Sequence, residues 1–200
     1  MNKRQQQGFT LVEIAIVLVI IGLLLGGVLK GQEMIANARY KNLRDDIQSY
    51  SAAYYTFQDR YRALAGDFDQ ASTRIDASAP DGNGNGNIQG ARCNNATDES
   101  CYVWQQLRYA GLISGDPGAS GGNANPSHAY GGELAGIYSG SNGNRTGVWL
   151  RMRTVPADVA RRLDDIDDGD ARNGTVYCAS GSCSGGSSPA TGNLRIYVLI

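Results

Sequence analysis

The stretch GFTLVEIAIVLVIIGLLLGGVL, residues 8–29, decides how the rest of the chain is organised. Between Phe9 and Leu29 it carries a single ionisable side chain, the carboxylate of Glu13. About 20 residues at a rise of about 1.5 Å each form a helix about 30 Å long, which is enough to cross a bilayer. An ionised carboxylate at that depth costs at least a few kcal/mol unless a cation neutralises it. The sequence therefore predicts a membrane-spanning helix whose Glu13 needs a partner from outside the run.

A short basic leader, MNKRQQQ, precedes Gly8. Lys3 and Arg4 are the only charged side chains ahead of the span, so we expect the leader to stay in the cytoplasm and the rest of the chain to lie across the membrane. Cleavage after Gly8 would create a new amine at Phe9, which is the nearest source of a cation. That amine fits the Glu13 of a neighbouring, axially shifted subunit better than it fits its own. An uncleaved signal anchor with a stray glutamate is the alternative.

The hexapeptide Gly8-Phe9-Thr10-Leu11-Val12-Glu13 resembles the processing site of type IV pilins and of the pseudopilins of type II secretion. The resemblance implies that a prepilin peptidase cleaves after Gly8 and N-methylates Phe9, and that Glu13 guides self-association into a helical filament. It also implies an assembly ATPase and a platform protein as partners, with membrane lipid around the helix before assembly. The implied location is the bacterial inner membrane, spanned once with the head in the periplasm, and then a filament in the periplasm or at the cell surface.

The helical pattern continues beyond the span. Apolar residues recur at alternating spacings of four and three, at Ala36, Tyr40, Leu43, Ile47, Tyr50, Tyr54, Phe57 and Tyr61. This spacing places them in one stripe and predicts a single helix from Phe9 to about Ala63. We expect the stripe to pack against a globular head, because it is short and aromatic; a coiled-coil dimer is the alternative.

The chain then divides into four segments. They are a leader at 1–8, a membrane-spanning or filament-core half-helix at 9–30, an amphipathic half-helix at 31–63 and a head at 64–200. Periodicity and turn signals in the head predict helices at 97–110 and 156–165 and strands at 133–139, 147–155, 175–178 and 194–200. The predicted fold is therefore α+β and pilin-like, with the long helix packed on a small antiparallel sheet.

The cysteines form two local pairs, Cys93 with Cys101 and Cys178 with Cys183. Four cysteines allow three pairings, and the short separations favour these two disulfides. Disulfides suit the oxidising compartment that an exported head would enter, whereas free buried thiols are the alternative. A metal site is disfavoured because the spacings do not match zinc motifs and His128 is the only histidine.

One polar loop resembles the opening half of an EF-hand. Oxygen-bearing side chains alternate with glycines at Asp81, Asn83, Asn85 and Asn87. They are candidate Ca²⁺ ligands, but the closing position of the loop is Arg92 instead of glutamate. Asp98 or Glu99 could replace it only if the chain folds back. The alternative is an Asn-Gly turn that holds no ion, and no cofactor is required for the predicted function.

Charge and motif content limit the remaining function classes. The formal net charge is −1, which argues against a general nucleic-acid surface. Arg151 and Arg153 alternate with Trp149 and either touch DNA or, as we prefer, pair with the acidic cluster at 164–170. No catalytic motif is recognisable around His128, so an enzyme is not expected.

Two function classes follow from these patterns. In the first, the protein is a structural subunit, a pilin or pseudopilin, that assembles into a type IV pilus-like or type II secretion filament. In the second, it is a minor or tip subunit whose head is a binding module, either an adhesin or a Ca²⁺-dependent one.

Overall fold

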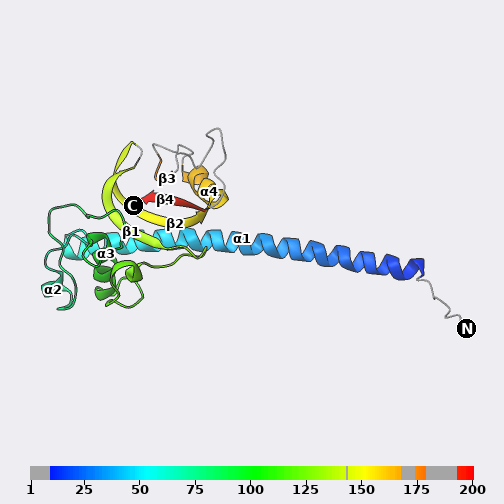
Figure 1. Ribbon diagram of the computed structural model, residues 1–200, viewed down its shortest axis with the longest axis horizontal. Helices are drawn as coiled ribbons and strands as arrows, with labels where there is room; N and C mark the ends of the chain where they lie inside the picture. The colour runs from blue at the N-terminus through cyan, green and yellow to red at the C-terminus, as the bar shows by residue number, and fades with distance from the viewer. Residues whose placement is uncertain (1–9, 143, 168–173, 179–192) are drawn as a thin grey trace, which may run out of the picture. The chain divides into compact units, whose positions relative to one another are not determined.

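A computed structural model describes residues 10–142, 144–167, 174–178 and 193–200. The chain falls into two compact units, Met1–Lys41 and Asn42–Ile200, which are described separately. Helix α1 (Leu11–Tyr61) begins in the first unit and ends in the second (Figure 1).

The first unit consists, over its described residues, of the apolar half of α1. The helix is uninterrupted through Gly22, Gly26, Gly27 and Gly31, although each glycine costs about 1 kcal/mol relative to alanine. Its large aliphatic side chains from Leu11 to Ile35 are exposed, with Leu11 at 91% and Leu23 at 79%, whereas Tyr40 is buried. Among the described helices, α1 alone is long and apolar enough to cross a membrane, with a mean hydropathy of 2.8 over its most apolar window.

The second unit buries the later part of the aromatic stripe. Leu43 and Phe57 are completely buried and Tyr54 is 2% exposed. The Tyr50 ring meets the Trp104 ring edge to face, with centroids 5.5 Å apart. The predicted packing of the stripe against the head is therefore confirmed for these residues.

Helix α1 ends at Tyr61, two residues before the predicted end. Arg62 follows in the left-handed region at φ 58°, and its N–H donates to the Gln58 carbonyl at 2.8 Å. A left-handed residue at this position is a common helix ending, although glycine usually fills it.

Short helices and turns connect α1 to the sheet. They are α2 (Ala71–Arg74), α3 (Glu99–Tyr109) and the 3₁₀ helix η1 (Gly121–Ala124). Helix α3 matches the helix predicted at 97–110, whereas α2 and η1 were not predicted. Helix α3 packs against β1 and η1, while α4 (Ala157–Asp167) packs against the other strands.

Four antiparallel strands form the sheet in the order β1-β2-β4-β3 (Figure 1). Their bounds are Leu134–Asn142 for β1, Arg145–Pro156 for β2, Val176–Cys178 for β3 and Asn193–Leu199 for β4. All four predicted strands are thus present within a few residues. One face carries Ile137, Leu150 and Ile196, which are completely buried. The alternating residues form the other face, which carries Trp149, Leu199, Arg151 and three tyrosines, Tyr138, Tyr177 and Tyr197.

Gln106 fixes the segment after α1 to the head core. Its side chain is completely buried on α3, and its Oε1 accepts the Gly66 N–H at 2.6 Å. Its Nε2 donates to the carbonyls of Phe68 at 3.2 Å and Pro80 at 2.9 Å. Gly66 has φ +94°, and a Cβ there would lie 2.7 Å from the Glu99 carbonyl oxygen. One amide side chain therefore joins three points of an irregular loop to a helix.

We predict that Gln106→Leu lowers the free energy of unfolding by about 2–4 kcal/mol, because it leaves the Gly66 N–H and the Pro80 carbonyl without partners and removes one of the two donors to the Phe68 carbonyl. Urea denaturation of the full chain in detergent, followed by tryptophan fluorescence, measures this change. Gln48→Ala on the exposed side of α1 is the control and should be neutral. Equal stability of the two variants would contradict the role assigned to Gln106.

Candidate functional site

The start of α1 places Glu13 in a capping box with Thr10. The Glu13 Oε2 accepts both the Thr10 N–H and the Thr10 hydroxyl at 2.8 Å. The Thr10 Oγ1 in turn accepts the Glu13 N–H at 3.3 Å. The pattern Thr-x-x-Glu ahead of an apolar run is a known sequence signature of this arrangement, so the cap was predictable from residues 10–13 alone, although it was not among the predicted features.

The capping box gives Glu13 hydrogen-bond partners from its own helix. Its carboxylate has local hydrogen-bond donors and lies at the partially positive end of a helix, so it is not without partners in a single chain. In the part of the chain that the structure describes, however, no cation pairs with it. Gly8 and Phe9 lie outside the described residues, and their predicted cleavage and methylation stay predictions.

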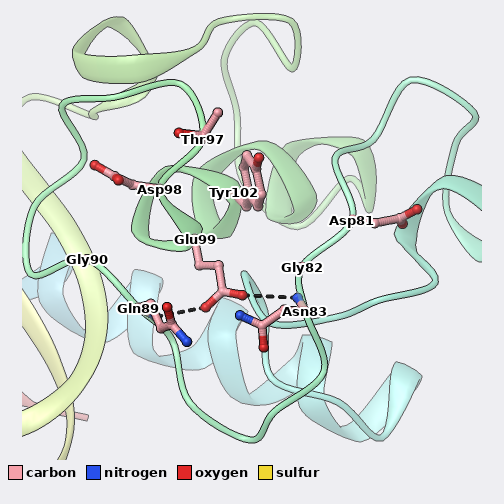
Figure 2. A pocket seen from close by; sticks show the side chains of 9 residues that line it. All are labelled: Asp81, Gly82, Asn83, Gln89, Gly90, Thr97, Asp98, Glu99 and Tyr102. Atoms are coloured by element: carbon pink, nitrogen blue, oxygen red, sulfur yellow. Dashed lines mark hydrogen bonds between the residues drawn. The ribbon is translucent and has the colours of Figure 1, made fainter.

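The polar loop at 81–89 is organised around two buried carboxylates, each 5% exposed. Glu99 at the start of α3 accepts the N–H of Asn83 at 3.0 Å and of Gln89 at 2.8 Å (Figure 2). Asp67 accepts the N–H of Asn85 at 2.9 Å and of Gly86 at 2.8 Å. The chain does fold back so that Glu99 reaches the loop, and there it binds backbone N–H groups.

The predicted calcium ligands mostly make local contacts. Asp81 accepts the hydroxyl and N–H of Ser72 at 2.6 and 2.8 Å, and these bonds hold the pKa of the Asp81 carboxyl below its usual value. The side-chain oxygens of Asn83 and Asn85 accept the N–H groups of Asn85 and Asn87, as in Asx turns. Among the described residues, no group of three or more His, Cys, Asp or Glu side chains is placed to hold a metal ion. The calcium site stays a prediction.

A pocket of about 340 Å³ lies between this loop and the start of α3. Its lining residues are Asp81, Gly82, Asn83, Gln89, Gly90, Thr97, Asp98, Glu99 and Tyr102. None of them is basic, so the pocket has carboxylates, neutral amide and hydroxyl groups and one aromatic ring. In Figure 2 the carboxylates of Asp81 and Asp98 point away from each other, which disfavours a shared ion between them.

The predicted disulfide between Cys93 and Cys101 is present. It closes a short loop, for which a stabilisation of about 2–3 kcal/mol is typical. Cys178 is also disulfide-bonded. Its predicted partner, Cys183, lies outside the described residues.

Both strand arginines have described partners. Arg153 pairs with Glu133 at 2.6 Å, because the end of β2 lies beside the start of β1. Arg151 donates to the backbone carbonyl of Ala91 at 3.0 Å. Most of the acidic cluster lies outside the described residues, so its pairing with Arg151 or Arg153 stays a prediction.

His128 is buried and hydrogen-bonded to backbone groups. It is 5% exposed, its Nε2 donates to the Arg153 carbonyl at 2.8 Å, and its Nδ1 accepts the Tyr130 N–H at 3.3 Å. Since a carbonyl can only accept, these partners fix the tautomer with hydrogen on Nε2. Both ring nitrogens are thus occupied by backbone groups, which leaves none to act as a base.

We predict that the loop is ordered without calcium, because Asp67 and Glu99 already hold its backbone. Amide hydrogen exchange of the full chain in detergent should show equal protection in chelator and in Ca²⁺ at Asn83, Asn85, Gly86 and Gln89. Glu99→Ala should remove the protection of Asn83 and Gln89. Asp98→Ala, at the adjacent position, is the matched control. Protection that appears only with Ca²⁺ would contradict this account and would establish the calcium site.

Comparison with known protein families finds a match at the N-terminus of the chain, where Glu13 lies. Residues 3–29 match the family model described as the prokaryotic N-terminal methylation motif. No curated protein and no solved structure matches the chain. The match includes the basic leader, the hexapeptide with Glu13 and the apolar run, and it ends before the head. Together with the long helix and small antiparallel sheet, it supports a type IV pilin-like prepilin segment at residues 3–29.

Proposed function

We propose that the protein is a structural subunit of a type IV pilus-like or type II secretion filament, released for assembly by leader cleavage. The exposed apolar half of α1 carries this proposal. Its side chains lie along an entire helix that no described residue of the first unit covers, and Leu11 and Leu23 remain largely exposed. Burying one such side chain contributes about 1.5–3 kcal/mol, so the helix strongly favours an apolar environment.

Two environments satisfy this requirement in turn. Lipid surrounds the helix of the precursor, which spans the inner membrane once with its head in the periplasm. Other copies of the helix surround it in the filament, which stays in the periplasm or extends from the cell surface. Self-association thereby replaces helix–lipid contacts with helix–helix contacts and keeps the apolar side chains out of water.

Glu13 favours the filament over the single helix in lipid. The capping box satisfies its hydrogen bonds but leaves its charge without a counterion among the described residues. The amine released at Phe9 supplies that counterion from a neighbouring subunit. A prepilin peptidase therefore controls assembly, because the amine does not exist before cleavage. The family resemblance adds an assembly ATPase and a platform protein as partners.

A minor or tip subunit with a binding head is the second candidate. The acceptor-rich pocket beside Glu99 favours it, since a purely structural head does not require such a cavity. Abundance separates the two candidates, because a major subunit dominates sheared filaments and a tip subunit is scarce in them. Either role is non-enzymatic.

We predict that the mature protein begins at an N-methylated Phe9. Intact-mass and peptide mass spectrometry of protein purified from its native membrane measures this terminus. An intact Met1 would contradict the processing that the proposed function requires.

We predict that Glu13→Gln reduces incorporation into filaments by roughly tenfold or more, since it removes the charge of an ion pair in an apolar environment. Glutamine preserves the capping box, so this variant separates the charge from the cap. Glu13→Ala, which removes both, should be equally defective, while insertion and cleavage stay normal in each. Quantifying the subunit in sheared filaments measures incorporation.

The matched control is Glu33→Gln on the same helix, where the carboxylate pairs with Lys30 on the exposed surface. It should assemble as the wild type does. Normal assembly of Glu13→Gln alongside failure of Glu13→Ala would assign the role to the cap and overturn the role of the charge.

A further inference from the structure

The face of the sheet opposite Ile137 and Leu150 carries a row of aromatic rings. Tyr138 on β1, Tyr197 on β4 and Tyr177 on β3 are successive members of this row. The Tyr197 ring centroid lies 6.2 Å from that of Tyr138 and 5.9 Å from that of Tyr177. Tyr177 and Tyr197 are partly exposed, so the row is accessible at its β3 and β4 side.

Arg151 lies within this row and has no carboxylate partner among the described residues. It is directly opposite Tyr197 in the β2–β4 pairing, and its Cζ lies 5.6 Å from the Tyr197 ring centroid. The side chain is buried to 7% exposure, and its Nη1 donates to the Ala91 carbonyl. Its Nε is buried and has no hydrogen-bond partner in the described part of the head. The guanidinium is therefore a nearly buried cation, stabilised there by one backbone carbonyl and a ring face.

Two further arginines lie close enough to act on Arg151. Burial lowers the pKa of its guanidinium, Tyr197 raises it, and the charges of Arg195 and Arg92 lower it further. Arg195 is exposed and lies two residues before Tyr197 on the same strand, while Arg92 is half-buried. Among the side chains described at residues 10–142, 144–164, 174–178 and 193–200, none of these three arginines has an ion pair with a carboxylate.

The fold holds Arg92 at this place. The segment before Cys93 crosses β1 at Gly136, where the Cys93 N–H donates to the Ala135 carbonyl at 2.7 Å. Gly136 permits this crossing, because its φ is +146° and a Cβ there would lie 3.2 Å from the Cys93 nitrogen. The disulfide to Cys101 fixes the same segment to α3. Arg92 thus lies in a loop held by a disulfide, and Arg151 and Arg195 lie on the adjacent strands β2 and β4. Their positions are therefore preorganised.

A buried cation without a counterion costs several kcal/mol, and adjacent like charges add to that cost. An anion bound at the arginines removes both penalties. Arginine recognises carboxylates and other oxyanions through paired N–H donors, and tyrosine offers a flat apolar ring with a polar edge. The combination suits a ligand that joins an anionic group to a ring-shaped apolar surface.

We propose that this arginine–tyrosine face, comprising Arg92, Arg151, Arg195, Tyr177 and Tyr197, binds an acidic polysaccharide. The carboxylates of uronic acid residues pair with the arginines, and a pyranose ring packs on the exposed tyrosines. This site is separate from the polar pocket beside Glu99, and its existence does not depend on filament assembly.

Two observations favour an acidic polysaccharide over single-stranded nucleic acid. The rings of Tyr138 and Tyr197 are inclined by 76° and those of Tyr177 and Tyr197 by 45°, so they do not form a platform on which successive bases stack. The whole chain has a net charge of −1, and three arginines are few against the several phosphate contacts that nucleic-acid binding normally uses.

The test is binding of an oligogalacturonate to the full chain in detergent, measured by calorimetry at low and moderate salt. We expect saturable binding that weakens with salt, and no binding of a neutral maltooligosaccharide. Arg195→Gln and Arg92→Gln should each weaken binding by about tenfold, as expected for the loss of one charge-assisted contact. Arg44→Gln, at an exposed position on α1, is the charge-matched control and should bind normally.

Arg151→Met is a further test variant, at a buried position of the site. It should abolish binding without lowering the melting temperature, because it replaces an unpaired buried cation by an apolar chain of similar length. Undetectable binding of the oligogalacturonate would overturn the proposal. Equal binding of the neutral oligosaccharide, or stronger binding of an oligothymidylate that the same variants weaken, would also overturn it.

Discussion

The exposed apolar surface of the first half of α1 is the constraint on which the protein depends. A helix of this composition cannot remain in water, and the described residues of its own unit provide no second layer to cover it. In the function we propose, lipid covers this surface in the precursor and identical helices cover it in the filament. The single carboxylate at Glu13 then distinguishes between them, because its capping box with Thr10 meets its hydrogen-bonding needs in either setting while its charge is balanced only by a cation.

In the head, a chain rich in glycine and asparagine is ordered by buried polar side chains that accept hydrogen bonds from backbone N–H groups. Asp67 and Glu99 organise the loop at 81–89, and Gln106 joins the segment after α1 to α3. Each of these side chains replaces the regular hydrogen bonds that the loop lacks, so the loop has a defined path in the absence of an ion.

Arg151 is a buried cation that has no carboxylate partner among the described residues of the head. Arg151 is nearly buried on the tyrosine-bearing face of the sheet, and the stapled segment before Cys93 brings another arginine towards it. By contrast, the buried side chains of Glu99 and Gln106 have hydrogen-bond partners for their polar atoms. An unbalanced cation in a rigid setting therefore marks the place where a ligand contributes most.

The sequence by itself determined the features that local patterns encode. The long apolar helix follows from composition, and the aromatic stripe and the four strands follow from periods of 3.6 and 2, because burial of one face imposes those periods. The Cys93–Cys101 pair followed from its short separation, and the Thr10–Glu13 cap was equally local. Only the tertiary structure decided that Glu99 turns to the loop, that Gln106 bridges three segments and that Arg92, Arg151 and Arg195 come together. These contacts join residues far apart in the chain, and the path of the intervening loops, which no local period specifies, sets which side chains meet.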